Sequence, residues 1–295
     1  MTLKKPHIPI FLAILVFFGY CPGTIQAFDW PAGAALIQRI QVLKQEIYNA
    51  KMLVVSAKSK KPNTAQAYLA MDLTNGAALM EKNPDKAYPI ASTAKLMTAV
   101  IASENIDSEK TISLTKDMLS PKGSSPAIFA GLNISAKNLL QASLIQSTND
   151  AAESLSYFIG REKFLALMNQ KAKEIGMVRT FFADVHGLDK QNLSTARDMA
   201  KLLTYIRKNN PEILEATKNN NFWLPDAQGK LLRFMNLNNF YGLPEFAGGK
   251  SGYSPEARQT FAGIFNIDNK PIAIVLLRST DFQSDTFKII ERLKN

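Results

Sequence analysis

The chain has 295 residues, 46% hydrophobic and 20% charged, so it can bury a sizeable core and is neither a disordered nor a fully membrane-embedded protein. Its formal net charge of +10 suits an anionic partner but identifies no function. The single cysteine, Cys21, lies in the N-terminal leader described next, so the chain without that leader has no disulfide, thiolate nucleophile or cysteine-based metal site.

Residues 1–27 have the pattern of a secretory signal peptide. Two lysines precede an apolar run from Ile8 to Phe18, and cleavage is predicted after Ala27. The run is short for a membrane span, so we predict an exported, periplasmic or extracytoplasmic protein without a transmembrane domain in the mature chain. An uncleaved anchor is the alternative, and loose membrane association stays open. An exported protein rarely meets nucleic acid, which favours an anionic envelope polymer as the partner of its basic surface.

The next segment, residues 28–62, is predicted to contain a helix and a polar linker. Apolar residues at helical spacing indicate the helix over 31–50. Two short strands are predicted next, Ala67–Asp72 and Ala77–Glu81, because Asn75-Gly76 between them is a strong hairpin turn signal.

The middle of the chain, from Ser92 to about Lys208, is predicted to be mainly helical, and Ser194-Thr195 before Asp198 indicates one helix start. Strands return after about residue 220 and a helix follows. The predicted elements there are strands Thr260–Ile267 and Pro271–Leu277, a turn at Asp268-Asn269, and a helix over Asp285–Leu293. This order predicts an α+β fold in one domain over 63–295, with a sheet from both chain ends and an inserted helical region at about 93–215.

Two familiar kinds of site are disfavoured. His186 is the only histidine outside the leader, so a Ser-His-Asp triad would need it, yet no G-x-S-x-G motif accompanies it and we interpret it as structural. The run Gly248-Gly249-Lys250-Ser251 resembles the end of a phosphate-binding loop, but Pro244 stands where that motif needs glycine. We therefore reject a nucleotide site.

A serine activated by a lysine is the remaining chemistry. Ser92-Thr93-Ala94-Lys95 fits S-x-x-K, and a helix beginning near Ser92 would place Lys95 one turn further on the same face. Burial and a second nearby cation would lower the pKa of Lys95, so that its amine could accept the hydroxyl proton. The motif is weak by itself, since Ser113–Lys116 also fits.

Two further motifs make an ordered set with the first. Ser147-Thr148-Asn149 fits S-x-N, as does Ser103-Glu104-Asn105, and Lys250-Ser251-Gly252 is the single match to K-[ST]-G. S-x-x-K, S-D-N and K-T-G are known together from class A β-lactamases and penicillin-binding proteins. The set calls for neither a metal nor a cofactor.

These motifs, with the flanking Pro89-Ile90-Ala91 and His186-Gly187-Leu188-Asp189, resemble the low-molecular-mass penicillin-binding proteins, a family of serine D-alanyl-D-alanine carboxypeptidases and endopeptidases. The resemblance runs from about Ala67 to about Leu293 and implies a β-lactamase/transpeptidase-like fold. It implies a cell-wall hydrolase that acts on peptidoglycan stem peptides and is inhibited by β-lactams. Asp184-Val185 departs from the family's more typical Asn-Pro.

The resemblance implies four catalytic positions: Ser92 as the nucleophile, Lys95 as the general base, Ser147 as a proton relay to the leaving amine, and Asn149 as the group that orients the substrate amide and Lys95. The backbone N–H groups of Ser92 and Tyr253 would form the oxyanion hole.

The resemblance also implies positions that bind substrate. Lys250 would be the nearby cation, Ser251 and Gly252 would line the strand on which the peptide docks, and Arg278 would hold a terminal carboxylate. Ser251 replaces the family's usual threonine but keeps the hydroxyl.

Carboxypeptidase activity is our prediction, and three alternatives stay open. An endopeptidase that cuts cross-links would attack the same D-alanyl carbonyl and differ only in what leaves. A class A β-lactamase would need a glutamate, commonly in E-x-x-L-N, and the chain lacks that pentapeptide. A non-catalytic wall-binding protein would have no need of the intact motif set.

Overall fold

The computed structural model describes residues 39, 62–119, 122, 125, 127–225, 228–238 and 240–295. Apart from Arg39, all of these fall in one compact unit, Lys44–Asn295. The predicted signal peptide lies outside the described residues, and so do the helix over 31–50, except for the helical Arg39, and nearly all of the linker. Their boundaries therefore stay predictions. Within the described part of the chain, no helix is both long enough and apolar enough to span a bilayer.

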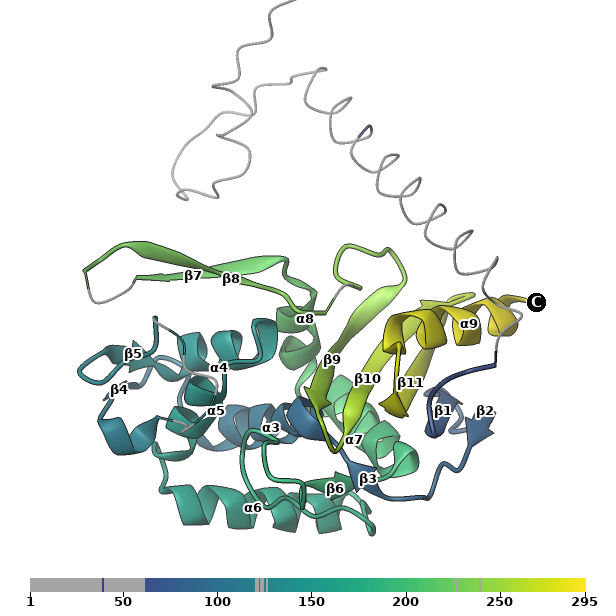
Figure 1. Cartoon of the computed structure of the whole chain (residues 1–295), viewed down its shortest axis with the longest axis horizontal. Coiled ribbons are helices and arrows are strands. Elements are labelled where there is room, and N and C mark those ends of the chain that lie inside the picture. The colour runs from purple at the N-terminus through teal and green to yellow at the C-terminus, as the bar shows by residue number, and fades with distance from the viewer. Residues whose placement is uncertain are drawn as a thin grey trace, which may run out of the picture. The chain divides into compact units, whose positions relative to one another are not determined.

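A five-stranded antiparallel sheet combines strands from both ends of the described chain (Figure 1), in the order β2-β1-β11-β10-β9. The strands are β1 (Ala67–Asp72), β2 (Ala78–Lys82), β9 (Phe246–Ser254), β10 (Arg258–Ile267) and β11 (Lys270–Ser279). β1 pairs antiparallel with β11, which joins the N-terminal hairpin to the C-terminal strands. The prediction of one sheet built from both chain ends is confirmed.

One face of the sheet packs on a cluster of phenylalanines beneath the C-terminal helix α9 (Phe282–Lys294). The ring of Phe240 lies at the centre of this cluster, 5.0 Å from Phe261 and 5.3 Å from Phe265. Edge-to-face ring contacts of this kind add to the hydrophobic gain from burial.

The other face of the sheet packs against the helical region. Ala262 and Ile264, which alternate along β10 with those phenylalanines, belong to the core shared with the helices. Because successive strand residues point to opposite faces, β10 is buried on both sides, and its middle reads as a nearly continuous apolar run.

Helices fill much of the segment between the two halves of the sheet. They are η1 (Ala91–Ala94), α3 (Lys95–Asn105), η2 (Lys116–Met118), α4 (Ala136–Ile145), α5 (Asn149–Ser156), α6 (Arg161–Glu174), α7 (Ala196–Asn209) and α8 (Pro211–Lys218). The predicted start of α7 is confirmed, because the Thr195 side chain accepts a hydrogen bond of 3.0 Å from the backbone N–H of Asp198.

The segment from Ser92 to about Lys208 is mainly helical, as predicted, but strands interrupt it between α3 and α4. Two short strands pair there, β4 (Thr111–Ser113) with β5 (Asn133–Ser135), and this pairing joins residues far apart in sequence. Short pairings also join β3 (Tyr88–Pro89) to β6 (Leu193–Ser194) and β7 (Asn221–Pro225) to β8 (Leu231–Met235). Such pairings depend on tertiary contacts that apolar spacing alone does not report.

Candidate active site

Ser92 lies where the sheet meets the helical region, in the short 3₁₀ turn η1 that runs into α3. The residue before it, Ala91, has φ of 46°, an uncommon value for a residue with a side chain. Thr260 of β10 fixes this entry by donating a hydrogen bond of 3.0 Å to the carbonyl of Ile90. The strained turn is therefore held by the sheet, and it presents a partly exposed Ser92 at its surface.

Lys95 is completely buried and its amine faces the hydroxyl of Ser92. The Nζ atom lies 3.0 Å from Ser92 Oγ, 2.7 Å from Asn149 Oδ1 and 2.7 Å from the backbone oxygen of His186. A neutral amine has two N–H bonds and one lone pair. The amide and backbone oxygens can only accept, so they take the two N–H bonds and leave the lone pair for the Ser92 hydroxyl.

The electrostatic surroundings favour this neutral form. Burial, followed by the charge of Lys250, holds the pKa of Lys95 well below its ordinary value, while Asp184 opposes the shift. Lys250 is itself only 2% exposed, and burial lowers its pKa to about 7. Lys95 carries both penalties, desolvation and a neighbouring cation, so it is suited to serve as a base near neutral pH.

The second motif occupies the turn between α4 and α5. Ser147 has φ of 62°, and Asn149 begins α5. The Asn149 side chain has two contacts with separate parts of the chain, since its Oδ1 accepts from Lys95 and its Nδ2 donates to the backbone oxygen of Lys122 at 3.1 Å. The contact between Asn149 and Lys95 supports the prediction that Asn149 orients Lys95. Ser147 lines the same cavity as Ser92.

The third motif runs along the edge strand β9, directly beside Ser92. A Cβ atom added to Gly252 would lie 2.7 Å from the backbone nitrogen of Ser92, closer than real side chains approach. Only glycine therefore allows β9 to pass this close to the nucleophile. Lys250 belongs to this strand and is buried, and its Nζ donates to the backbone oxygen of Ser251 at 2.9 Å.

A cavity of about 380 Å³ unites residues from all three motifs. It is lined by Ser92, Gln146, Ser147, Asn149, Leu188, Leu237, Ser251, Gly252, Tyr253, Gln259 and Phe282. Tyr253 is 69% exposed at its edge, so an incoming chain can reach this side chain. Six of the nine predicted site residues meet here, and the two buried lysines lie behind them.

Arg278, like the two buried lysines, does not line this cavity, and its own contact lies elsewhere. It lies near the end of β11 with φ of 55°, where the register between β10 and β11 shifts. Its guanidinium donates instead to the backbone oxygen of Glu256 at 3.0 Å. Its predicted role in holding a terminal carboxylate remains a prediction without a contact to the cavity.

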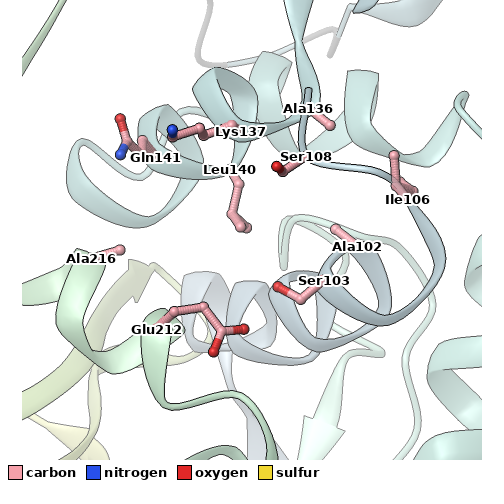
Figure 2. Close-up of a pocket in the computed structure, with 10 residues that line it drawn as sticks. All are labelled: Ala102, Ser103, Ile106, Ser108, Ala136, Lys137, Leu140, Gln141, Glu212 and Ala216. Atoms are coloured by element: carbon pink, nitrogen blue, oxygen red, sulfur yellow. The ribbon is translucent and has the colours of Figure 1, made fainter. Parts of the chain in front are cut away.

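Another cavity, of about 480 Å³, lies between α3, α4 and α8 (Figure 2). It includes Ser103 of the second S-x-N match, together with Glu212 and Leu140, but none of the nine predicted site residues. Volume therefore does not select the site, and the chemistry of the side chains does. The other S-x-x-K match is also set aside, because Ser113 ends β4 and Lys116 is exposed.

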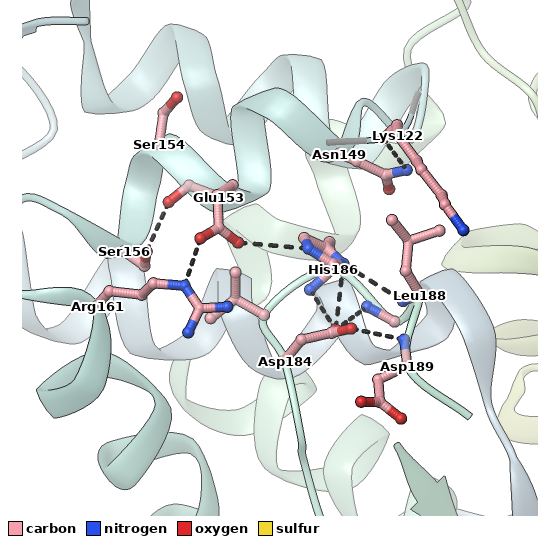
Figure 3. Close-up of polar contacts among 12 residues, drawn as sticks. Lys122, Asn149, Glu153, Ser154, Ser156, Arg161, Asp184, His186, Leu188 and Asp189 are labelled. Carbon is pink, nitrogen blue, oxygen red and sulfur yellow. Dashed lines mark hydrogen bonds and ion pairs between the residues drawn. The ribbon is translucent and has the colours of Figure 1, made fainter. Parts of the chain in front are cut away.

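No sequence pattern indicates the buried polar cluster that lies next to Lys95. His186 was interpreted as a structural loop residue, yet its imidazole lies between the carboxylates of Asp184 and Glu153 (Figure 3). Glu153 comes from α5, so only the folded chain brings it to the loop that carries His186.

Comparison with known proteins identifies this constellation. The model of a peptidase family, described as D-alanyl-D-alanine carboxypeptidase, matches residues 54–280. The chain belongs to this family. The family and enzyme class expected from the motifs are thereby confirmed.

Individual relatives agree with the family. A D-alanyl-D-alanine endopeptidase of Haemophilus influenzae is 39% identical over 145 residues, 48% of this chain and 50% of that protein, so this match spans about half of the relative. A D-alanyl-D-alanine endopeptidase of Pseudomonas aeruginosa is 31% identical over 71% of this chain and 69% of its own length. Relatives named as carboxypeptidases match as well.

Solved structures extend the likeness to the fold. Penicillin-binding protein D2 from Listeria monocytogenes, in an ampicillin-bound form, is 30% identical with a TM-score of 0.69, over 78% of this chain and 97% of that one. The predicted β-lactamase/transpeptidase-like α+β fold is confirmed. In the described part of this carboxypeptidase-family chain, no group of three or more His, Cys, Asp or Glu side chains is placed to hold a metal ion.

Proposed function

We propose that this chain is a serine-type D-alanyl-D-alanine peptidase that cuts peptidoglycan stem peptides through an acyl-enzyme on Ser92. One observation carries the proposal: the amine of a fully buried Lys95 lies 3.0 Å from the Ser92 hydroxyl, and both of its N–H bonds have other acceptors. This is the arrangement that an activated serine requires.

The positions of these groups support the following reaction. Ser92 Oγ transfers its proton to Lys95 Nζ and bonds to the carbonyl carbon of the D-alanyl residue. The backbone N–H groups of Ser92 and Tyr253 stabilise the negative charge that develops on the carbonyl oxygen. The C–N bond then breaks, the leaving amine takes a proton through Ser147, and an ester on Ser92 remains until water hydrolyses it.

The remaining motif residues bind the substrate and tune the base. The peptide extends beside β9, where Ser251 and Gly252 face the cavity. Lys250 keeps the pKa of Lys95 low by its positive charge. β-Lactams present an amide carbonyl like that of the substrate and acylate Ser92. Because the sequence lacks the E-x-x-L-N pentapeptide that commonly supplies a deacylating glutamate, we expect this ester to be long-lived.

Carboxypeptidase activity, with D-alanine as the leaving group, is the activity we propose first, in keeping with the family description. One observation favours the endopeptidase as the second candidate. Among the described residues that line the cavity there is no lysine or arginine, whereas a free terminal carboxylate is best held by a cation. An endopeptidase substrate has a further peptide in that place and needs no such cation.

Purified protein incubated with defined muropeptides separates these functions. Release of D-alanine from pentapeptides identifies a carboxypeptidase, and conversion of cross-linked dimers to monomers identifies an endopeptidase. A fluorescent penicillin should label the wild type and leave Ser92→Ala unlabelled. Equal labelling of the two proteins, or rapid turnover of the penicillin, would refute the proposed acyl-enzyme chemistry.

The N-terminal pattern and the substrate both bear on the cellular location. A periplasmic or extracytoplasmic location fits the signal-peptide pattern of residues 1–27 and a substrate that lies outside the cytoplasm. The N-terminal residue of the secreted protein would test it: a chain that begins near Phe28 supports cleavage, and an intact Met1 in the membrane fraction supports an anchor.

A further inference from the structure

The loop from Asp184 to Asp189 contacts both the nucleophile and the base. The backbone oxygen of His186 accepts from Lys95 Nζ at 2.7 Å. Gly187, with φ of 89°, is so close to the turn before Ser92 that an added Cβ would lie 2.0 Å from the oxygen of Ala91. Any movement of this loop therefore displaces the groups that must react.

The Asp184 carboxylate organises the loop from within. It accepts from the backbone N–H groups of His186 at 3.0 Å, Gly187 at 2.5 Å and Asp189 at 2.6 Å. Although burial opposes its ionisation, its contacts with His186 and with these N–H groups hold the pKa of Asp184 far below its ordinary value. The loop thus has a permanent buried negative charge close to Lys95.

The imidazole of His186 links this loop to α5. Its Nε2 lies 3.3 Å from Glu153 Oε2 and its Nδ1 lies 3.2 Å from Asp184 Oδ1, while the side chain is 7% exposed. Glu153 in turn pairs with the guanidinium of Arg161 at the start of α6. Figure 3 shows the chain of contacts from Arg161 through Glu153 and His186 to Asp184.

Two states of the ring are compatible with these contacts. The backbone N–H of Leu188 also points at Nδ1, at 3.3 Å, and one nitrogen cannot accept there and donate to Asp184 at once. With both nitrogens protonated, the ring is a cation paired with both carboxylates. With a neutral ring, Nδ1 can accept from Leu188, a residue that lines the catalytic cavity.

The charges favour the protonated ring. The groups that face it are Asp184 in its own loop, Glu153 from α5 and Lys95 from α3, with Arg161 of α6 behind Glu153. Although burial lowers the pKa of His186, its contacts with Asp184 and Glu153 outweigh that effect and raise it. Two carboxylates, one guanidinium and one imidazolium are then neutral together, whereas a neutral ring leaves one buried negative charge beside Lys95.

We propose that His186 is a positioning residue for the general base Lys95. Its protonated ring neutralises the charge of Asp184, which would otherwise favour the ammonium form of Lys95. The ring also fixes the loop whose backbone oxygen accepts a hydrogen bond from the Lys95 amine. This rests on the base function proposed for Lys95. The same proposal makes Glu153 of α5 a second positioning residue with the opposite effect, because its negative charge is partly neutralised by the His186 ring.

The acid limb of the pH profile for acylation tests this directly. His186→Asn removes a positive charge, so the pKa of Lys95 rises and the limb moves to higher pH by on the order of one unit. Glu153→Gln removes a negative charge while the contact with Asp184, the larger of the two that raise the pKa of His186, keeps the ring protonated, so the limb moves to lower pH. The rate of penicillin acylation is measured by stopped flow for both variants and the wild type, beside their melting temperatures.

A purely structural role would lower the rate or the melting temperature of both variants while leaving the limb in place. The proposal is overturned if the acid limbs of both variants coincide with that of the wild type, or if both move in the same direction. Should His186→Asn fail to fold, the Glu153→Gln shift stands alone as the test.

An independent readout needs no variant to function. The ¹⁵N resonances of the His186 ring, distinguished from those of His7 by a His7→Gln sample, should report a doubly protonated ring at pH about 6.5, the ordinary midpoint of histidine. A neutral ring at that pH overturns the proposal. A wild-type protein that does not react with penicillin would instead refute the proposed function, whereas reaction with unmoved limbs refutes only the role of His186.

Discussion

Replacing Gly252 with alanine should disable the active site more than it destabilises the fold. The added Cβ would lie 2.7 Å from the nitrogen of Ser92 and 2.8 Å from Thr260 Oγ1, whereas ordinary contacts begin near 3.4 Å. β9 and the turn before α3 must therefore separate by about 0.7 Å, from 2.7 to 3.4 Å. A displacement of about 1 Å at a reacting group can cost about a hundredfold in rate, so we expect acylation to fall roughly 10- to 100-fold.

The same strand offers a matched control for this experiment. A Cβ on Gly249 would lie 2.4 Å from Gly263 Cα, inside the sheet and away from Ser92. Both variants overpack β9, and each should lose about 1–3 kcal/mol of unfolding free energy. Denaturant unfolding and the rate of labelling by a fluorescent penicillin are measured on both. If Gly252→Ala acylates as fast as folded Gly249→Ala, β9 does not position the nucleophile as described.

Three further substitutions test separate parts of the site. Lys250→Met should move the acid limb of acylation to higher pH, because the cation that lowers the pKa of Lys95 is lost. It should also make the unfolding free energy rise less steeply above pH 7 than in the wild type. Lys250 has a pKa of about 7 when folded and about 10.4 when unfolded, so the unfolded chain binds more protons in between, and the variant keeps only the similar contribution of Lys95. An equal rise in both proteins would contradict the folded-state value. Asn149→Ala should slow acylation about 10- to 100-fold and cost about 1–3 kcal/mol, because a buried Lys95 N–H loses its acceptor, and unchanged kinetics would show that the 2.7 Å contact is dispensable. Arg278→Ala should change the KM for a D-alanyl-D-alanine peptide less than about threefold, since its partner is the Glu256 backbone; a tenfold rise, about 1.4 kcal/mol, would restore the carboxylate role expected from the sequence.

Local signals predicted those parts of the fold whose partners are close in sequence. β1 has the bounds expected for it, Ala67–Asp72, because its apolar run ends at a strong turn signal. The turn at Asp268 and Asn269 joins β10 to β11 as predicted, and both residues have the positive φ that such two-residue hairpins require. The two short strands between α3 and α4 were not predicted, since the pairing of Ile112 with Ile134 depends on contact between distant segments.

In the candidate site, too, residues within short motifs could be predicted and residues brought in from distant segments could not. Short motifs were enough to select Ser92, Lys95 and Asn149, and the structure brings these three within hydrogen-bonding distance. Motifs do not report side chains that act on the site from behind. Glu153 lies on the buried face of an ordinary-looking helix and reaches the site only through His186, so no spacing in the sequence could indicate it.

The two faces of β10 explain how one fold supports both a stable core and a costly active site. Two buried lysines each lower stability at neutral pH, because an ammonium group loses its hydration and its pKa falls. On one face of the strand, Phe261 and Phe265 pack into the ring cluster under α9 and supply apolar burial without polar groups. Near its start, Thr260 bonds to the backbone before Ser92 instead. Packing of Phe261 and Phe265 thus keeps β10 rigid, and Thr260 of the same strand holds the turn before Ser92. The uncommon φ of Ala91 is maintained because this contact with the sheet fixes the turn.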